Sequence, residues 1–333
     1  MQQRLWRNAG EVPKGSTGWR DTTSQGLRSQ VDGIGDARSG GSSQIRSTGP
    51  GDAPESCKTA SCLPRAERRH LKENLMKKWA LITGASGGIG LEIARVLAEK
   101  GYALVLTARG EDALERLAQA LEREHGAHCL TVPLDLGAPG SVDALVRFVA
   151  EAGVQPNVLV NNAGIGVYGR FADVDPERIQ AMVDLNVGAL TRLIALLLPA
   201  MLKHGGGRIL NVASTAAFQP GPGMAVYFAS KAYVLSLSEA LDVELRPLGI
   251  TVTVLCPGAT DTGFMSSARA QRSALFKGRL AKARDVAQYG VAAMERGQRV
   301  AIHGKLNRIM AVGVRFTPRR LAAAMAGWMV REV

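Results

Sequence analysis

Short apolar runs alternate along the chain with longer stretches in which apolar residues recur every three or four positions. The short runs predict strands that are buried on both faces, and the longer stretches predict helices with one apolar face. The predicted strands comprise residues 79–83, 102–108, 128–134, 157–164, 208–214, 250–258 and 298–304. The predicted helices comprise residues 88–100, 111–125, 141–152, 176–203, 224–246 and 283–296.

The regular alternation of strand and helix predicts an α/β fold. We expect a doubly wound, Rossmann-like parallel sheet of about seven strands with helices on both faces. This single domain is expected to cover residues 76–304. Residues 305–333 then form a basic amphipathic extension, which Pro318 divides into two short helices.

Residues 1–75 lack this pattern and are rich in Gly, Ser, Pro and Arg. Such a segment buries too little apolar surface to offset the entropy of ordering, so we expect it to be disordered. The first strand follows Met76 directly, and Lys72 and Glu73 can be encoded by a purine-rich ribosome-binding sequence. In a bacterial source we therefore expect Met76 to be the true start and residues 1–75 not to be translated. A genuine disordered or targeting extension is the alternative, although the segment has no apolar core of a secretory signal.

The net charge of +12 is concentrated near the end of the chain, where residues 266–333 contain 14 basic and 3 acidic residues. This charge fits an anionic substrate, a membrane surface or an ordinary solvated surface. Aromatic residues make up 5% of the chain, so we expect no nucleic-acid partner. The longest apolar run, 193–202, is too short to span a bilayer.

The four cysteines are Cys57, Cys62, Cys129 and Cys256. They show neither the spacing of metal ligands nor a disulfide framework. We therefore expect no metal site and a cytoplasmic, reducing location, with contact to a membrane surface as an option through the basic extension.

The segment "TGASGGIG" (83–90) follows the first predicted strand and opens the first predicted helix. Its glycines allow a tight turn and let backbone N–H groups approach a pyrophosphate, so the turn predicts a dinucleotide site. Arg109 follows the second strand, where an acidic residue would bind the ribose 2′-hydroxyl of NAD. A guanidinium instead suits a 2′-phosphate, which favours NADP(H) and leaves NAD(H) possible. A surface arginine without this role is the alternative.

Three candidate catalytic residues follow the fifth predicted strand. Ser214 ends that strand, and Tyr227 and Lys231 lie one turn apart at the start of the next helix. The carboxyl ends of parallel strands line one crevice, where the cofactor binds in such sheets. We therefore expect the tyrosine and the lysine to face the crevice from one side of their helix.

The motifs in this order resemble the short-chain dehydrogenase/reductase family over about residues 77–304. They are "TGASGGIG", "NNAG" (161–164), Asn186, Ser214, "YFASK" (227–231) and "PGATDT" (257–262). The resemblance implies that Tyr227 is the acid/base and that Ser214 polarises the substrate oxygen. It implies that Asn186 supports a water chain through Lys231. We expect the Lys231 ammonium, together with the positive nicotinamide ring of the oxidised cofactor, to lower the pKa of Tyr227. The same lysine is expected to hold the nicotinamide ribose.

The resemblance also places a set of residues at the cofactor. They are Gly84, Ser86, Gly88, Ile89, Gly90, Arg109, Asp135, Asn162, Ala163, Gly164, Tyr227, Lys231, Pro257, Gly258 and Thr262. Asp135 falls near the adenine and Thr262 near the carboxamide, although such residues often only cap turns. Gly87 departs from the family pattern, because many NADPH-preferring members have a basic residue there. Arg109 is then the main expected contact to the 2′-phosphate.

Together these residues predict an NADPH-dependent oxidoreductase that interconverts a ketone or aldehyde and an alcohol by hydride transfer. The alternative is a nucleotide-sensing or membrane-associated binding protein on the same fold. We expect a lid over about residues 262–282. Its apolar residues favour an apolar or lipid-like substrate, and its basic residues favour a negative one. The residues concerned are Phe264, Met265, Leu275 and Phe276, and Arg269, Arg272 and Lys277.

The resemblance implies a homodimer or homotetramer that forms through helices 176–203 and 224–246. For the extension 305–333, three interpretations stay open. Its apolar side can contact a membrane peripherally, close the substrate pocket, or join an oligomer interface.

Overall fold

A computed structural model describes residues 77–264, 268 and 280–331, which all belong to one unit of the chain, Lys58–Val333. The segment 1–75 and the expected start at Met76 lie outside the described residues. The same is true of residues 265–267 and 269–279 of the expected lid, which include Met265, Arg269, Arg272, Leu275, Phe276 and Lys277.

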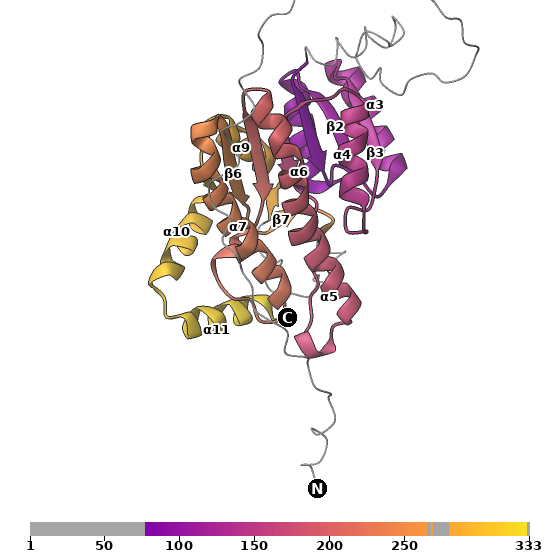
Figure 1. The fold of residues 1–333 in the computed structure, drawn as a ribbon. Helices are drawn as coiled ribbons and strands as arrows, with labels where there is room; N and C mark the ends of the chain where they lie inside the picture. The colour runs from indigo at the N-terminus through magenta and orange to yellow at the C-terminus, as the bar shows by residue number, and fades with distance from the viewer. Residues whose placement is uncertain (1–76, 265–267, 269–279, 332–333) are drawn as a thin grey trace, which may run out of the picture. The chain divides into compact units, whose positions relative to one another are not determined.

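Seven parallel strands form one sheet in the order β3-β2-β1-β4-β5-β6-β9 (Figure 1). Their bounds are β1 (Trp79–Thr83), β2 (Ala103–Ala108), β3 (Cys129–Pro133), β4 (Pro156–Asn161), β5 (Gly207–Val212), β6 (Ile250–Cys256) and β9 (Val300–Ile302). The strand order reverses between β1 and β4, which opens a crevice at the carboxyl ends of these strands. The predicted doubly wound sheet is confirmed.

Helices cover both faces of the sheet, as predicted (Figure 1). One layer consists of α4 (Ser141–Glu151), α6 (Leu190–Lys203) and α7 (Ala225–Leu245), and the other of α2 (Gly88–Glu99), α3 (Glu111–His125) and α9 (Ala283–Glu295). The side chains of alternate residues in β1 pack against opposite helix layers. Trp79 and Leu81 pack in the first, and Ala80 and Ile82 pack in the second. All four side chains are fully buried, which explains why the first four positions of this strand are apolar.

The helix predicted over 176–203 is continuous but not uniform. α5 (Pro176–Val183) leads into a π-helical turn (Asp184–Ala189), and α6 follows directly. The whole helix has 28 residues, so by length and composition it could cross a bilayer, and the expectation drawn from the run 193–202 was too narrow. In this fold its apolar side instead packs on the sheet as part of the core.

Short elements follow β6. β7 (Thr260–Asp261) pairs in parallel with β8 (Ala281–Lys282). The sequence did not indicate this pair, because two-residue strands leave no alternating pattern. After β9 come α10 (Lys305–Gly313), a 3₁₀ turn (Val314–Phe316) and α11 (Arg319–Val330), and Pro318 separates the two helices as predicted. Further 3₁₀ turns comprise Phe171–Asp173, Thr215–Phe218 and Arg246–Leu248.

Asp242 joins three elements far from the crevice. This fully buried carboxylate on α7 accepts hydrogen bonds from the Val252 N–H at 3.0 Å, from Arg299 at 2.8 Å and from Arg246 at 2.8 Å. Burial raises its pKa, but these hydrogen bonds outweigh burial and hold the pKa below its ordinary value. Asp242 therefore stays ionised and ties α7 to β6 and to the start of β9.

Candidate active site

A cleft of about 500 Å³ opens at the carboxyl ends of the strands. Its walls are the turn after β1, the ends of β2, β4 and β5, the start of α7, and the segment after β6. The cleft therefore lies at the point where the strand order reverses, where a doubly wound sheet binds its ligand. Of the predicted site residues, all but Gly90 and Asn186 line this cleft.

The turn after β1 is shaped for a close backbone approach. Gly84 has φ +66°, and a Cβ there would lie 2.8 Å from the Asn162 Nδ2. Gly88 has φ +55°, and a Cβ there would lie 3.0 Å from Thr262, whereas nothing lies within 4 Å of a Cβ on Gly87. Only glycine fits at Gly84 and Gly88. The open space at Gly87 leaves room for a pyrophosphate at the start of α2. The cleft thus suits a dinucleotide.

Gly90 is buried on α2 and is not among the residues that line the cleft, so its predicted contact with the cofactor stays a prediction. A Cβ there would clash with the carbonyl oxygen of Gly84 and with the amide nitrogen of Asn162. The residue is fully buried on the inner side of α2. Its role in the structure is to let α2 pack closely on the turn.

Asn162 and Thr83 hold the end of β4 against this turn. The Asn162 Nδ2 donates to the carbonyl oxygens of Thr83 and Gly84, both at 3.0 Å. The Thr83 hydroxyl oxygen accepts from the backbone N–H groups of Asn162 and Ala163, both at 3.0 Å. The side chain of Asn162 is therefore engaged by protein, and only its outer atoms and backbone face the cleft, together with Ala163 and Gly164.

Arg109 directly follows β2 and Asp135 closely follows β3, on the side of the cleft that the resemblance assigns to the adenosine. Arg109 is exposed, lines the cleft, and has no ion pair or hydrogen bond within the described part of the chain. Asp135 Oδ1 accepts from the Gly137 N–H at 3.0 Å, so it caps a turn while it also lines the cleft. On the opposite side, the Thr262 hydroxyl oxygen accepts from the Phe264 N–H at 3.3 Å.

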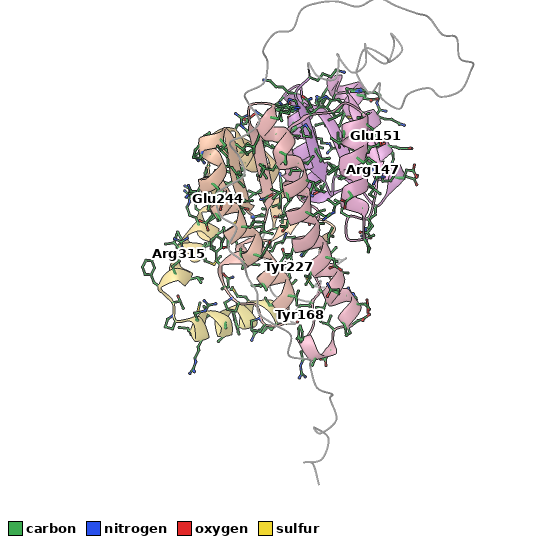
Figure 2. All side chains as sticks on the ribbon, viewed as in Figure 1. Arg147, Glu151, Tyr168, Tyr227, Glu244 and Arg315 are labelled. Carbon is green, nitrogen blue, oxygen red and sulfur yellow. The ribbon has the colours of Figure 1, made fainter. Side chains whose placement is uncertain are left out.

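Tyr227, Ser214 and Lys231 meet on one wall of the cleft. The Lys231 Nζ lies 5.8 Å from the centre of the Tyr227 ring and donates to the Val212 carbonyl oxygen at 2.9 Å. Ser214 hydrogen-bonds the tyrosine side chain. Figure 2 shows Tyr227 on α7. The structure therefore brings together the three side chains that the sequence placed on a strand end and a helix start.

The pKa values of this group differ from the sequence-based expectation. Burial raises the pKa of Tyr227 to about 12, and the hydrogen bond from Ser214 only partly opposes it. Burial also lowers the pKa of Lys231 to about 8. In the protein alone the tyrosine pKa is thus not lowered, because desolvation outweighs the hydrogen bond from Ser214, and the expected lowering included the charge of the oxidised cofactor. At neutral pH the pair consists of a neutral phenol and an ammonium.

Asn186 lies in the π-helical turn and is 2% exposed. Its Oδ1 accepts from the Ile165 N–H, and its Nδ2 donates to the Ile165 carbonyl oxygen, both at 2.9 Å. The Nδ2 also lies 3.1 Å from the Ser230 hydroxyl. Both polar groups of the side chain are therefore engaged by protein, Oδ1 keeps a second acceptor position, and the expected support of a water chain stays a prediction. In the structure the side chain fixes the irregular segment after β4, around Gly164 and Ile165, next to Lys231.

The sequence did not identify the apolar end of the cleft. Met224, Phe228, Ala326 and Val330 are buried together, with Tyr168, Tyr227 and Phe264 packed against them. The rings of Tyr227 and Phe264 lie 5.2 Å apart. Ala326, Met329 and Val330 of α11 line the cleft, and Figure 2 labels Tyr168 and Tyr227 near this helix. The sequence signals were Phe264 in the expected lid and the amphipathic spacing of the extension, for which pocket closure was one of three interpretations.

Comparison with known proteins agrees with this geometry. The sequence profile described as short chain dehydrogenase matches residues 78–273. The chain belongs to this family. It is therefore an NAD(P)-dependent oxidoreductase that acts on CH–OH groups, as the sequence predicted. Among the described residues, no group of three or more His, Cys, Asp or Glu could hold a metal ion.

Several relatives cover most of the domain. A ketoacyl reductase named HetN from Nostoc sp. is 35% identical over 196 residues, which are 59% of this chain and 68% of the relative. A short-chain dehydrogenase from Sphingobium yanoikuyae, solved in complex with NADPH, has 34% identity and a TM-score of 0.65 over 72% of this chain and 94% of its own. A short-chain dehydrogenase/reductase from Burkholderia phymatum, solved with NAD, has 29% identity and a TM-score of 0.64 over 73% of this chain and 93% of its own.

Proposed function

We propose that this protein is an NADPH-dependent reductase of apolar ketones or aldehydes, with Tyr227 as the proton donor. The observation that carries the proposal is the position of Tyr227. Its ring lies between the lysine that can stabilise a phenolate and an apolar wall built by Phe264, Met224 and α11. A carbonyl carbon that enters over this wall meets the proton donor and the cofactor site together.

The chain's own residues divide the chemistry among them. A bound nicotinamide supplies the hydride that reduces the carbonyl carbon. Tyr227 gives its phenolic proton to the carbonyl oxygen as that oxygen gains negative charge. Ser214 donates a hydrogen bond to the same oxygen, and the ammonium of Lys231 stabilises the phenolate that remains. The raised pKa of Tyr227, about 12, keeps the phenol protonated at neutral pH, which suits the direction of reduction.

The preference for NADPH rests on Arg109. Its guanidinium stands at the cleft end of β2, where a carboxylate would repel a 2′-phosphate, and it has no protein partner among the described residues. The relative from Sphingobium yanoikuyae was solved with NADPH, which supports the preference, and the relative solved with NAD leaves use of NADH as a weaker activity.

The substrate end of the cleft supports an apolar, acyl-like substrate. Its wall consists of apolar side chains, and the expected basic residues of the lid are outside the described part of the chain. The name of the Nostoc relative, a ketoacyl reductase, agrees with a carbonyl carried on an acyl chain.

We also propose that the enzyme is a cytoplasmic homodimer or homotetramer. Leu196 on α6 and Tyr233 on α7 keep 37% and 38% of their surface exposed on the two helices that the resemblance implicates in assembly. The cysteines in the described residues, Cys129 and Cys256, are free thiols, which supports a reducing compartment.

The substitution Tyr227→Phe tests the catalytic assignment. It keeps the ring and removes the donor, so we expect kcat for NADPH oxidation with an aliphatic ketone to fall about a hundredfold or more. NADPH binding, measured by fluorescence titration, should persist. Tyr233→Phe, on the same helix as Tyr227, is the matched control, because it removes a hydroxyl that lies 3.0 Å from the Thr191 hydroxyl on α6. A Tyr227→Phe enzyme that keeps more than about a tenth of the activity would contradict the mechanism. The absence of turnover in wild type across a broad carbonyl panel would favour a nucleotide-sensing protein.

A further inference from the structure

The segment Lys305–Arg331, which we call the arm, exposes many large apolar side chains. We call the following set the outer face: Leu306, Ile309, Met310, Phe316, Leu321, Met325 and Trp328, which are 68%, 68%, 44%, 85%, 53%, 54% and 61% exposed. Figure 1 shows α10 and α11 at the periphery of the domain, beyond the layers that cover the sheet. Single exposed apolar residues are common, but a contiguous set on adjoining helices marks an interaction surface.

Helical spacing explains why these side chains stay exposed. On α11, Leu321, Met325 and Trp328 follow one another at intervals of four and three residues, so they form one stripe. Ala322, Ala326 and Val330 form a second stripe, which is buried against the loop before α7 and the apolar end of the cleft. A Cβ on Gly327 would lie 3.3 Å from Pro222, which shows how closely α11 packs there. One side of α11 therefore packs against the cleft, and the other side stays exposed to solvent.

The arm is also strongly basic. Between Lys305 and Arg331 the sequence contains six basic residues and no acidic one. The six are Lys305, Arg308, Arg315, Arg319, Arg320 and Arg331. The Arg331 guanidinium lies over the Trp328 ring, 4.6 Å from its centre. Figure 2 labels Arg315 at the outer corner between α10 and α11. The cations thus border the outer face, which is the arrangement of an interfacial helix with long basic side chains around an apolar stripe.

We propose that the outer face docks on the surface of an anionic lipid bilayer. The apolar stripe enters the boundary between headgroups and acyl chains, and the six basic residues meet the lipid phosphates. A second copy of this chain is a poorer occupant. An isologous contact would place the same basic residues against one another with no acidic partner from the arm.

Docking in this way places the substrate cleft near the lipid. Met329 and Val330 line the cleft from the helix whose other side carries Met325 and Trp328. A lipid-like substrate could then pass around α11 without crossing bulk water. This consequence for substrate access rests on the proposed function, whereas the docking itself does not.

Vesicle sedimentation with the full chain tests the docking. We would use vesicles of phosphatidylglycerol and phosphatidylcholine, and vesicles of phosphatidylcholine alone. The arm variant is Ile309→Glu with Phe316→Glu, both at highly exposed positions. The control is Phe171→Glu with Leu248→Glu, which are 63% and 55% exposed outside the arm. We expect wild type and control to sediment with anionic vesicles and the arm variant to bind more than about tenfold more weakly.

Quenching of Trp328 provides a second measurement. Brominated anionic lipids should quench wild type more than Trp328→Phe, because the indole would lie in the interface. Three results would overturn the proposal. They are no binding of wild type to anionic vesicles, equal loss in the control, or a lipid-free oligomer that the arm variant alone dissociates. Sedimentation needs no turnover, so a failed carbonyl screen and a failed docking test remain distinguishable.

Discussion

Replacing Lys231 with methionine should remove most of the support for the Tyr227 phenolate. The Nζ lies 5.8 Å from the ring centre, and at an effective dielectric constant of about 20 one charge at that distance is worth about 3 kcal/mol. This corresponds to about two pKa units for the tyrosine. If most of the phenolate charge has developed in the transition state, kcat for reduction should fall about a hundredfold.

The pH dependence distinguishes the charge of Lys231 from its packing. Burial lowers the pKa of Lys231 to about 8, so the ammonium is present below that pH and is lost above it. For wild type, kcat/KM for NADPH-dependent reduction should therefore hold steady to about pH 8 and then decline. In Lys231→Met the decline should disappear, since no ammonium remains to lose its proton.

The assay is steady-state NADPH oxidation from pH 6 to 10, with NADPH affinity measured separately by fluorescence. Affinity should weaken as well, because the same lysine is expected to hold the nicotinamide ribose. Urea unfolding would check that loss of the Lys231 bond to the Val212 carbonyl does not disrupt β5. A variant with nearly unchanged kcat, or one that keeps the wild-type decline near pH 8, would refute the reasoning.

Two further substitutions test other parts of the structure. Arg109→Leu should raise the Michaelis constant for NADPH and leave that for NADH nearly unchanged, and equal losses with both would mean that the residue acts through folding. Asp242→Ala should lower the free energy of unfolding in urea by about 2 kcal/mol, because it leaves the Val252 N–H buried without its acceptor. Asp143→Ala, which breaks the exposed pair with Arg192, should change it far less, and similar losses would argue against the role of burial.

The sequence predicted the layers of the fold because each strand is apolar at consecutive positions and each helix has one apolar face. β1 is the simplest case, since Trp79 to Thr83 are all buried and belong to both layers. The position of the cleft followed from the same reasoning, because Gly84, Ser214 and Arg109 all stand at carboxyl ends of parallel strands. The order of strands and helices was therefore enough to predict that these site residues lie along one cleft.

The remaining features depend on packing between distant residues. The π-helical turn around Asn186 leaves the apolar spacing of the helix intact, so no period in the sequence shows it. The hydrogen bonds between Asn186 and Ile165 join positions 21 apart. The raised pKa of Tyr227 comes from burial, to which Phe264 and the distant residues of α11 contribute. Sequence patterns report local geometry, and these features come from contacts that only the folded chain brings together.

The cleft draws its two ends from separate stretches of the chain, and this has a consequence for how the enzyme evolves. Tyr227 and Lys231, the proposed catalytic pair, and the glycine turn lie within residues 78–273, which match the family model. Ala326, Met329 and Val330, which line the apolar end, come from beyond that stretch. Recombination near β9 can therefore exchange one substrate-contacting tail for another and leave the hydride-transfer apparatus intact. Paralogues that diverge in their last residues should differ in the substrates they accept while their hydride-transfer chemistry stays the same.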